Sequence, residues 1–256
     1  MILRRLGNKK KIAKEIQKHF PPHKIYIEPF FGAGGMFFYK PKVKYNVVND
    51  LDSDVFNLYD IILNRKKEFE KMFKLMPIHT DLIKYWKEYK GDDNLNRALR
   101  FLALSNFTLN GTGTSLRSNV LENPKKEVLK YLKQTIEYMQ DVKFLNMDCN
   151  KFIKTLAFRP NSNEINTTLI YCDPPYLGTN DNYSNSFTEE QSEELFDTLE
   201  ETGCKFAMSE FYHPFILEQA KQRNLNVIII GERQNLKNRR TEILVTNYSN
   251  SQQSLF

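Results

Sequence analysis

The sequence predicts an α/β fold built on a mostly parallel, seven-stranded sheet. Seven short apolar runs, rich in β-branched or aromatic residues, recur along the 256 residues and alternate with helical patterns. Such alternation is typical of a parallel sheet with helices on both faces. Residues 54–140, in contrast, contain one helical pattern after another and no clear strand. We therefore expect a sheet domain of residues 1–53 and 141–256, interrupted by a helical domain of residues 54–140.

The predicted elements follow from the period of their apolar residues. In chain order, the predicted strands are KIYIEPF (24–30), YNVVND (45–50), KFLNMD (143–148), TLIYCD (168–173), KFAMSE (205–210), NVIIIGE (226–232) and EILVTNY (242–248). The helical patterns of the inserted segment include DVFNLYDIILNRKKEFEKMF (54–73), NLNRALRFLALSNF (94–107) and PKKEVLKYLKQTIEYM (124–139).

The charge of the chain favours a polyanionic partner. It has 37 Lys and Arg against 31 Asp and Glu, a formal net charge of +6. Basic side chains that neutralise phosphates release condensed counterions, which promotes binding to nucleic acid. A generically soluble basic protein is the alternative that charge alone leaves open. No apolar run approaches the roughly 20 residues of a membrane span, and the N-terminal segment lacks a signal-peptide core, so we expect a cytoplasmic protein.

The cysteines and histidines do not predict a metal site. The three cysteines, Cys149, Cys172 and Cys204, lie far apart and form no CxxC pair. None of the histidines has HExxH spacing. These patterns argue against a disulfide framework and against a zinc cluster.

A glycine turn and an acid follow the first two predicted strands. In IEPFFGAGGMFF (27–38), Gly32, Gly34 and Gly35 allow a tight turn and close approach of a ligand to the backbone, although the spacing differs from the GxGxxG fingerprint. Asp50 stands at the tip of the second strand, where an acid can accept hydrogen bonds from ribose hydroxyls or cap the next helix. Together the two features indicate an adenosine-containing ligand.

The segment DPPY (173–176) follows the fourth predicted strand. Two prolines end a strand and hold their neighbours in a stiff arrangement. Asp173 and the Pro174 carbonyl can each accept one hydrogen of an exocyclic amine, while Tyr176 stacks on the ring that carries it. Accepting both hydrogens draws the nitrogen lone pair out of conjugation, as a poor nucleophile such as adenine N6 requires. A simple strand terminator is the alternative, but it does not account for the acid and the aromatic together.

Two segments are candidates for nucleic-acid contact. The first, LNGTGTSLRSN (109–119), offers Asn110 and Arg117 to phosphates or base edges, and an ordinary helix connection is an equal alternative. The second, ERQNLKNRRTE (232–242), is a basic cluster that can bind phosphates, with a solvated loop as the alternative. Its candidate residues are Arg233, Lys237, Arg239 and Arg240.

The sequence resembles the Dam-like (D12-class) DNA adenine-N6 methyltransferases, which use S-adenosyl-L-methionine. The matching segments occur in the family's order along most of the chain. They are LRRLGNKKKIAKEI, EPFFGAGGMFF, NDLDSDVFNLY, RALRFLALSNFTLNGTG, FLNMDCNKF, DPPYLG and EILVTNY. The resemblance implies a Rossmann-like methyltransferase fold and a helical target-recognition domain.

The resemblance also implies roles for individual residues. Lys9 corresponds to a lysine near the methionine part of the cofactor, and Asp148 to the acid that meets the cofactor adenine. The other residues implied in cofactor binding are Phe30, Phe31, Gly32, Gly34, Asp50 and Asp173. The target base, flipped out of duplex DNA, is expected to meet Asp173, Pro174 and Tyr176. The segment GTNDNYSNSF (178–187) is a candidate to close over this base, with an ordinary surface loop as the alternative.

The expected partner is double-stranded DNA, with a cognate restriction endonuclease as a further candidate and a monomer or weak dimer as the oligomeric state. Two other functions stay open from sequence. An RNA adenine methyltransferase would differ in its acceptor, and a non-catalytic DNA-binding regulator would not bind the cofactor. A glutamine-modifying protein methyltransferase is disfavoured because such enzymes generally resemble NPPY.

Overall fold

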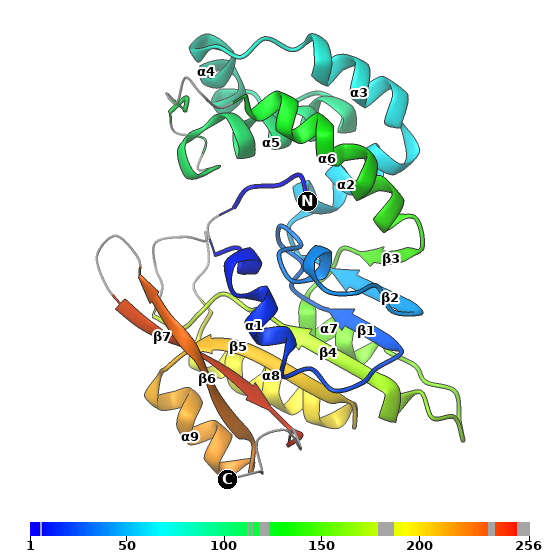
Figure 1. The fold of residues 1–256 in the computed structure, drawn as a ribbon, viewed down its shortest axis with the longest axis vertical. Coiled ribbons are helices and arrows are strands. Elements are labelled where there is room, and N and C mark those ends of the chain that lie inside the picture. The colour runs from blue at the N-terminus through cyan, green and yellow to red at the C-terminus, as the bar shows by residue number, and fades with distance from the viewer. Residues whose placement is uncertain are drawn as a thin grey trace.

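The computed structural model is built on a seven-stranded sheet with the order β3-β2-β1-β4-β5-β7-β6 (Figure 1). It describes residues 1–5, 7–111, 113, 115–117, 123–178, 187–234 and 239–249. Only β7 is antiparallel to its neighbours, so the expected α/β fold with a mostly parallel sheet is confirmed. The strands are β1 (Ile25–Glu28), β2 (Tyr45–Asn49), β3 (Val142–Leu145), β4 (Thr168–Cys172), β5 (Lys205–Phe211), β6 (Asn226–Gln234) and β7 (Arg239–Thr246).

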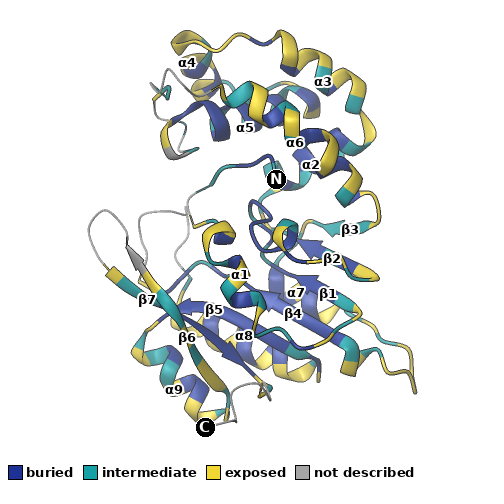
Figure 2. Cartoon of the chain, viewed as in Figure 1, coloured by how far each residue is buried: buried dark blue, intermediate teal, exposed yellow. Residues whose placement is uncertain are grey.

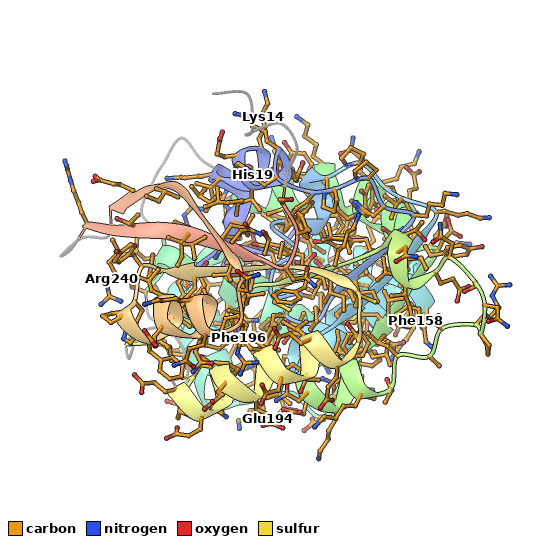
Figure 3. All side chains as sticks on the ribbon, turned by 90° about the horizontal axis from the view of Figure 1, so that it is seen from below. Lys14, His19, Phe158, Glu194, Phe196 and Arg240 are labelled. Carbon is orange, nitrogen blue, oxygen red and sulfur yellow. The ribbon has the colours of Figure 1, made fainter. Side chains whose placement is uncertain are left out.

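Helices cover both faces of the sheet because alternate strand residues point to opposite sides. Ile170 and Cys172 face a core shared with α7 (Cys149–Lys154), α8 (Glu189–Glu201) and α9 (Pro214–Gln222). Tyr171 faces the other core, which includes α1 (Ala13–Gln17). Figure 3 shows the amphipathic character of α8, with Phe196 on the side of the sheet and Glu194 on the opposite side.

The segment between β2 and β3 is helical, as expected. It contains α2 (Ser53–Asn64), α3 (Lys66–Leu75), α4 (Thr80–Glu88), α5 (Asn94–Phe107) and α6 (Pro124–Met139), of which α3 to α6 gather at one end of the molecule (Figure 1). In the described part of this segment, the β pairing is limited to one isolated bridge, Thr108 with Leu116. The division of the chain into two domains stays a prediction.

The helical segment and the sheet share a core. The Tyr59 ring on α2 lies 5.2 Å from the ring of Phe31, after β1, and 5.6 Å from that of Phe144 on β3. Figure 2 shows β1, β4 and β5 as mainly buried, with exposed residues on the outer surfaces of α3 and α4. The position of α2 is thus fixed against the carboxyl ends of the first strands.

The N-terminal segment connects α5 to the sheet. The Arg4 amide donates to Ser105 Oγ at 2.8 Å, and the Asn106 side chain donates to the Ile2 carbonyl at 2.9 Å. The short 3-10 helix η1 (Lys9–Lys11) and α1 follow directly. No helix in the described ranges is both long and apolar enough to cross a membrane.

Candidate active site

A cavity of about 600 Å³ lies at the carboxyl ends of β1, β2 and β4. Strand order reverses between β1 and β4, and ligands of open α/β sheets bind at such a switch point. Its lining brings together seven of the residues proposed from sequence. They are Lys9, Phe30, Phe31, Gly32, Asp50, Asp148 and Asp173. Residues that follow four different strands, β1 to β4, therefore share one cavity.

The segment after β1 forms a tight turn. The Phe31 amide donates to the Asn49 carbonyl at 2.9 Å, and the Gly34 amide donates back to the Phe31 carbonyl at 2.8 Å. Gly34 has a φ of +72°, and a Cβ there would lie 2.5 Å from the Phe38 ring and 2.8 Å from the Phe31 ring. Gly34 is thus required for packing beneath the turn and lies outside the cavity lining, whereas Gly32, with a φ of +54°, faces open space.

Asp50 binds the glycine turn. One carboxylate oxygen accepts from the Gly32 amide at 2.5 Å, and the other accepts from the Asp52 amide at 2.8 Å. Burial raises the pKa of Asp50, and the two backbone hydrogen bonds oppose this shift. The N-cap of α2 is Asp52, whose side chain accepts from the Asp54 amide, so the alternative in which Asp50 caps this helix is wrong.

Asp148 is the N-cap of α7 and lines the cavity. Its Oδ1 accepts from the Lys151 amide at 3.0 Å, and the next residue, Cys149, also lines the cavity. The Phe30 ring meets Phe187 edge to face at 6.1 Å. The cavity lining therefore includes a carboxylate and two aromatic rings, which suit a planar heterocycle that carries an amine.

Lys9 and Asp173 form an ion pair beside the cavity. Lys9 Nζ lies 2.6 Å from Asp173 Oδ1, and the lysine side chain is only 4% exposed. Gly35 makes this approach possible, because a Cβ at that position would collide with the Asn8 side chain and lie 2.8 Å from the Lys9 amide nitrogen. The glycine turn thus also allows η1, which carries Lys9, to pack against it.

Tyr176 is buried behind this pair. Its hydroxyl donates to Glu242, its ring meets Phe211 edge to face at 4.6 Å, and Lys9 Nζ lies 4.4 Å from the ring centre. Asp173 and Pro175 line the cavity, whereas Pro174 and Tyr176 are not part of its lining. In this structure one face of the Tyr176 ring is therefore covered by the Lys9 ammonium.

Sequence reasoning missed three buried carboxyl groups near the site. Glu28 lines the cavity, and Glu210 and Glu242 lie behind DPPY on β5 and β7. Burial raises the pKa of Glu28 and of Glu210 to about 8. Glu28 accepts from the Tyr26 hydroxyl at 2.7 Å, and Glu210 accepts from the Leu177 amide at 3.3 Å. An acid inside an apolar strand was the signal that could have identified them.

The candidate DNA contacts lie at two places. Arg117 is half-buried, and its amide donates to the Phe107 carbonyl at 2.8 Å. Arg239 is exposed, with Nη1 3.7 Å from Glu232. Arg240 donates to the Gly178 carbonyl at 3.4 Å and so connects β7 to the end of DPPYLG. The side chains of Asn110 and Arg233, all of Lys237, and residues 179–186 of the expected closing segment lie outside the described residues.

The cysteines lie in the protein core. Cys149, Cys172 and Cys204 are buried and form no disulfide. Burial raises the pKa of the Cys149 thiol to about 12. Among the residues that the structure describes, no three His, Cys, Asp or Glu side chains are grouped to hold a metal ion.

Residues 6–246 match the family model of the D12 class N6 adenine-specific DNA methyltransferases. A DNA adenine methylase of Vibrio cholerae is 26% identical over 220 residues, which cover 79% of this chain and 76% of that protein. The Type II methyltransferase M1.LlaDCHI of Lactococcus lactis subsp. cremoris is 24% identical over 278 residues, covering 95% and 94%. The N-terminal domain of human METTL16 in complex with SAH aligns with a TM-score of 0.40 at 11% identity, covering 93% and 68%. The family match spans nearly the whole chain, which therefore belongs to the D12 class of N6 adenine-specific DNA methyltransferases.

Proposed function

We propose that this DNA adenine methyltransferase uses S-adenosyl-L-methionine and methylates N6 of an adenine flipped out of double-stranded DNA into the site beside DPPY. One observation carries the proposal. A single cavity is lined both by the glycine turn with Asp50 and by Asp173, the first residue of DPPY. A methyl donor and an amine acceptor bound at these two walls would meet inside it.

The polar and aromatic groups that line the cavity suit S-adenosyl-L-methionine. The volume of the cavity, about 600 Å³, lies within the usual range of small-molecule sites. Asp50 and Asp148 offer carboxylate oxygens for ribose hydroxyls and for the adenine amine, and Glu28 lies at the end of β1 for the methionine part. Phe30 and Phe187 supply apolar contact. When bound, S-adenosyl-L-methionine supplies an electrophilic methyl group on a positively charged sulfur.

In the proposed mechanism, the protein acts by positioning and by accepting hydrogen bonds. Asp173 accepts one hydrogen of the target amine and the Pro174 carbonyl accepts the other, so the lone pair becomes available for in-line attack. Asp173 then stabilises the positive charge that develops on the amine. A carboxylate is a weak base at neutral pH, so the proton leaves only after the methyl group has arrived. Tyr176 offsets part of the cost of flipping, a few kcal/mol, by stacking on the base.

Binding to Asp173 requires a change at Lys9. Oδ1 of Asp173 is paired with the Lys9 ammonium, and Oδ2 has no hydrogen bond to the described residues. The target amine can therefore use Oδ2 while Lys9 keeps the carboxylate oriented. For stacking on the ring face that Lys9 covers, the ammonium must move by a small rotation of its flexible side chain.

The DNA partner is expected to contact both ends of this site. Helices α3 to α6 and the loop with Asn110 and Arg117 are the proposed target-recognition region. Arg233, Lys237 and Arg239 on the β6–β7 side are the proposed phosphate contacts. A cognate restriction endonuclease, a monomeric or weakly dimeric state and a cytoplasmic location stay predictions.

The test is transfer of labelled methyl groups from S-adenosyl-L-methionine to unmethylated genomic DNA, followed by nucleoside analysis. We expect N6-methyladenine with the wild-type protein and at least about 100-fold less with Asp173→Ala. Duplex RNA in parallel reactions distinguishes the RNA alternative. Folded protein that binds the cofactor but labels only RNA would contradict the proposed acceptor.

A further inference from the structure

Glu242 is a buried acid behind the proposed site. It lies on β7, between β5 and the edge strand β6, where it is paired with Phe211 of β5 and Gly231 of β6. Its side chain is 1% exposed. A carboxyl group so deeply buried is costly unless it is paired or hydrogen-bonded, so its contacts indicate what it is retained for.

Glu242 contacts both Lys9, which is paired with Asp173, and Tyr176, which is proposed to stack on the target base. Oε1 accepts the hydrogen bond of the Tyr176 hydroxyl and lies 3.6 Å from Lys9 Nζ. The same ammonium lies 2.6 Å from Asp173 Oδ1. One cation is therefore shared by two carboxyl groups, of which the closer lines the cavity and the other lies behind it.

The presence of two carboxyl groups beside the Lys9 ammonium affects the charge around the target amine in the proposed reaction. If Lys9 paired with Asp173 alone, it would neutralise the carboxylate and oppose the positive charge that develops on the amine. A second carboxyl group offsets the ammonium, so that the region around the amine stays net negative.

We propose that Glu242 is a positioning residue for methyl transfer. It holds the Lys9 ammonium and the Tyr176 hydroxyl from behind, and it balances the charge of Lys9 so that Asp173 can accept the hydrogen bond of the target amine. The inference rests on the proposed function and assigns a role to a residue outside both the DPPY segment and the cavity lining.

If Glu242 had a purely structural role, its variants would behave differently. A carboxyl group that only completes the packing of β7 can be replaced by the isosteric amide, which still accepts from the Tyr176 hydroxyl. Loss of charge alone would then have little effect on the rate. The pair Glu242→Gln and Glu242→Asp separates the two roles, because the first keeps shape without charge and the second keeps charge with a shorter reach.

The experiment compares three quantities for these two variants and for Glu218→Gln, an exposed acid on α9 that serves as control. They are the single-turnover rate of methyl transfer to DNA, the dissociation constant of S-adenosylhomocysteine by calorimetry, and the midpoint of thermal unfolding. We expect Glu242→Gln to slow transfer by about 30-fold while the dissociation constant changes by less than about 3-fold. Glu242→Asp should be faster than the glutamine variant and slower than the wild type, and Glu218→Gln should match the wild type.

Several outcomes would overturn the inference. They are a glutamine variant as fast as the wild type, an aspartate variant no faster than the glutamine variant, or a rate loss accompanied by an equal loss of cofactor affinity. If Glu242→Gln shows no cooperative unfolding transition, Tyr176→Phe replaces it, since it removes one contact of Glu242 and keeps the ring. That variant should slow transfer by about 5-fold at unchanged cofactor affinity, and a wild-type rate would contradict the inference. Absence of N6-methyladenine with the wild-type protein would instead refute the proposed function.

Discussion

The Lys9 ammonium lies 2.6 Å from Asp173 Oδ1, although the two residues are far apart in the sequence. Removing one partner of a buried ion pair leaves an uncompensated charge. We expect Lys9→Met to lower the free energy of unfolding by about 3 kcal/mol, because Asp173 then loses the ammonium that is paired with it. Urea denaturation measures this loss.

The double variant Lys9→Met, Asp173→Asn is the control for this prediction. It removes the charge that the single variant leaves unpaired, so it should recover part of the lost stability. Two losses that simply add would show that Lys9 and Asp173 are not coupled.

The two glycines of the turn after β1 should respond differently to alanine. Gly34→Ala places a Cβ 2.5 Å from the Phe38 ring at a φ of +72°, so it should cost at least about 2 kcal/mol of stability. Gly32→Ala meets no atom within 4 Å and should cost only about 1 kcal/mol, from its left-handed conformation. Because Gly32 lines the cavity, its variant should instead weaken binding of S-adenosylhomocysteine. Thermal unfolding and calorimetry on both variants check the contrast, which the reverse order of effects would refute.

Sequence reasoning located the strands and the polar residues that follow them, because both depend on local patterns. All seven predicted strands are present, and the acids Asp50, Asp148 and Asp173 line one cavity. The roles of the buried acids could not be predicted in the same way. Glu242 acquires its contacts from Lys9 and Tyr176, which lie on distant segments, and strand order within a sheet is not encoded in the local period.

The different roles of the neighbouring acids Asp50 and Asp52 could not be predicted from the sequence alone. Asp50 and Asp52 are both plausible N-caps by residue type. The carboxylate of Asp50 accepts from the Gly32 amide, which lies 18 residues earlier in the chain, and this leaves the cap of α2 to Asp52. Only the packing of the first two strands decides between them.

Asp50 should be required for cofactor binding more than for folding. Asp50→Ala removes the acceptor of the Gly32 and Asp52 amides and the proposed acceptor of the ribose hydroxyls. We expect the dissociation constant of S-adenosylhomocysteine to rise by at least about 10-fold, the equivalent of one charge-assisted hydrogen bond. Asp60→Asn, on α2 and outside the cavity lining, is the control. Equal affinity of the Asp50 variant and the wild type would remove Asp50 from the proposed site.

Glu28 should make stability depend on pH. Burial raises its pKa from 4.5 to about 8, so between these values the folded protein keeps a proton that the unfolded chain has released. The stabilising contribution is fully present below pH 4.5 and is lost as the pH rises through 8, with a slope of up to about 1.4 kcal/mol per pH unit. Glu28→Gln cannot titrate, so its free energy of unfolding should fall less steeply over this range.

The measurement for Glu28 is urea denaturation at several pH values for the wild type and for two variants. Glu193→Gln, an exposed acid on α8, should parallel the wild type. Parallel curves for Glu28→Gln and the wild type would show that Glu28 ionises normally in the folded protein.

Arg239 should contribute to DNA affinity without reading sequence. Each phosphate contact that is lost lowers the dependence of binding on salt concentration by about one unit of slope in a log–log plot. We expect Arg239→Ala to weaken binding to any duplex and to reduce the slope by about this amount, whereas Lys221→Ala, on α9, should change neither. Fluorescence anisotropy with two unrelated duplexes at several salt concentrations makes the comparison. An unchanged slope would place Arg239 away from the phosphates.

The position of β7 has a consequence for the time at which the protein becomes active. This strand is the last of the described strands in the sequence, yet it lies between β5 and β6 and carries Glu242. Lys9 is synthesised 233 residues before Glu242, its second carboxylate partner (242 − 9 = 233). If Glu242 has the role proposed for it, a nascent chain that already contains the glycine turn and DPPY still lacks a finished site. Methylation of DNA would have to wait until translation has delivered β7 into the sheet.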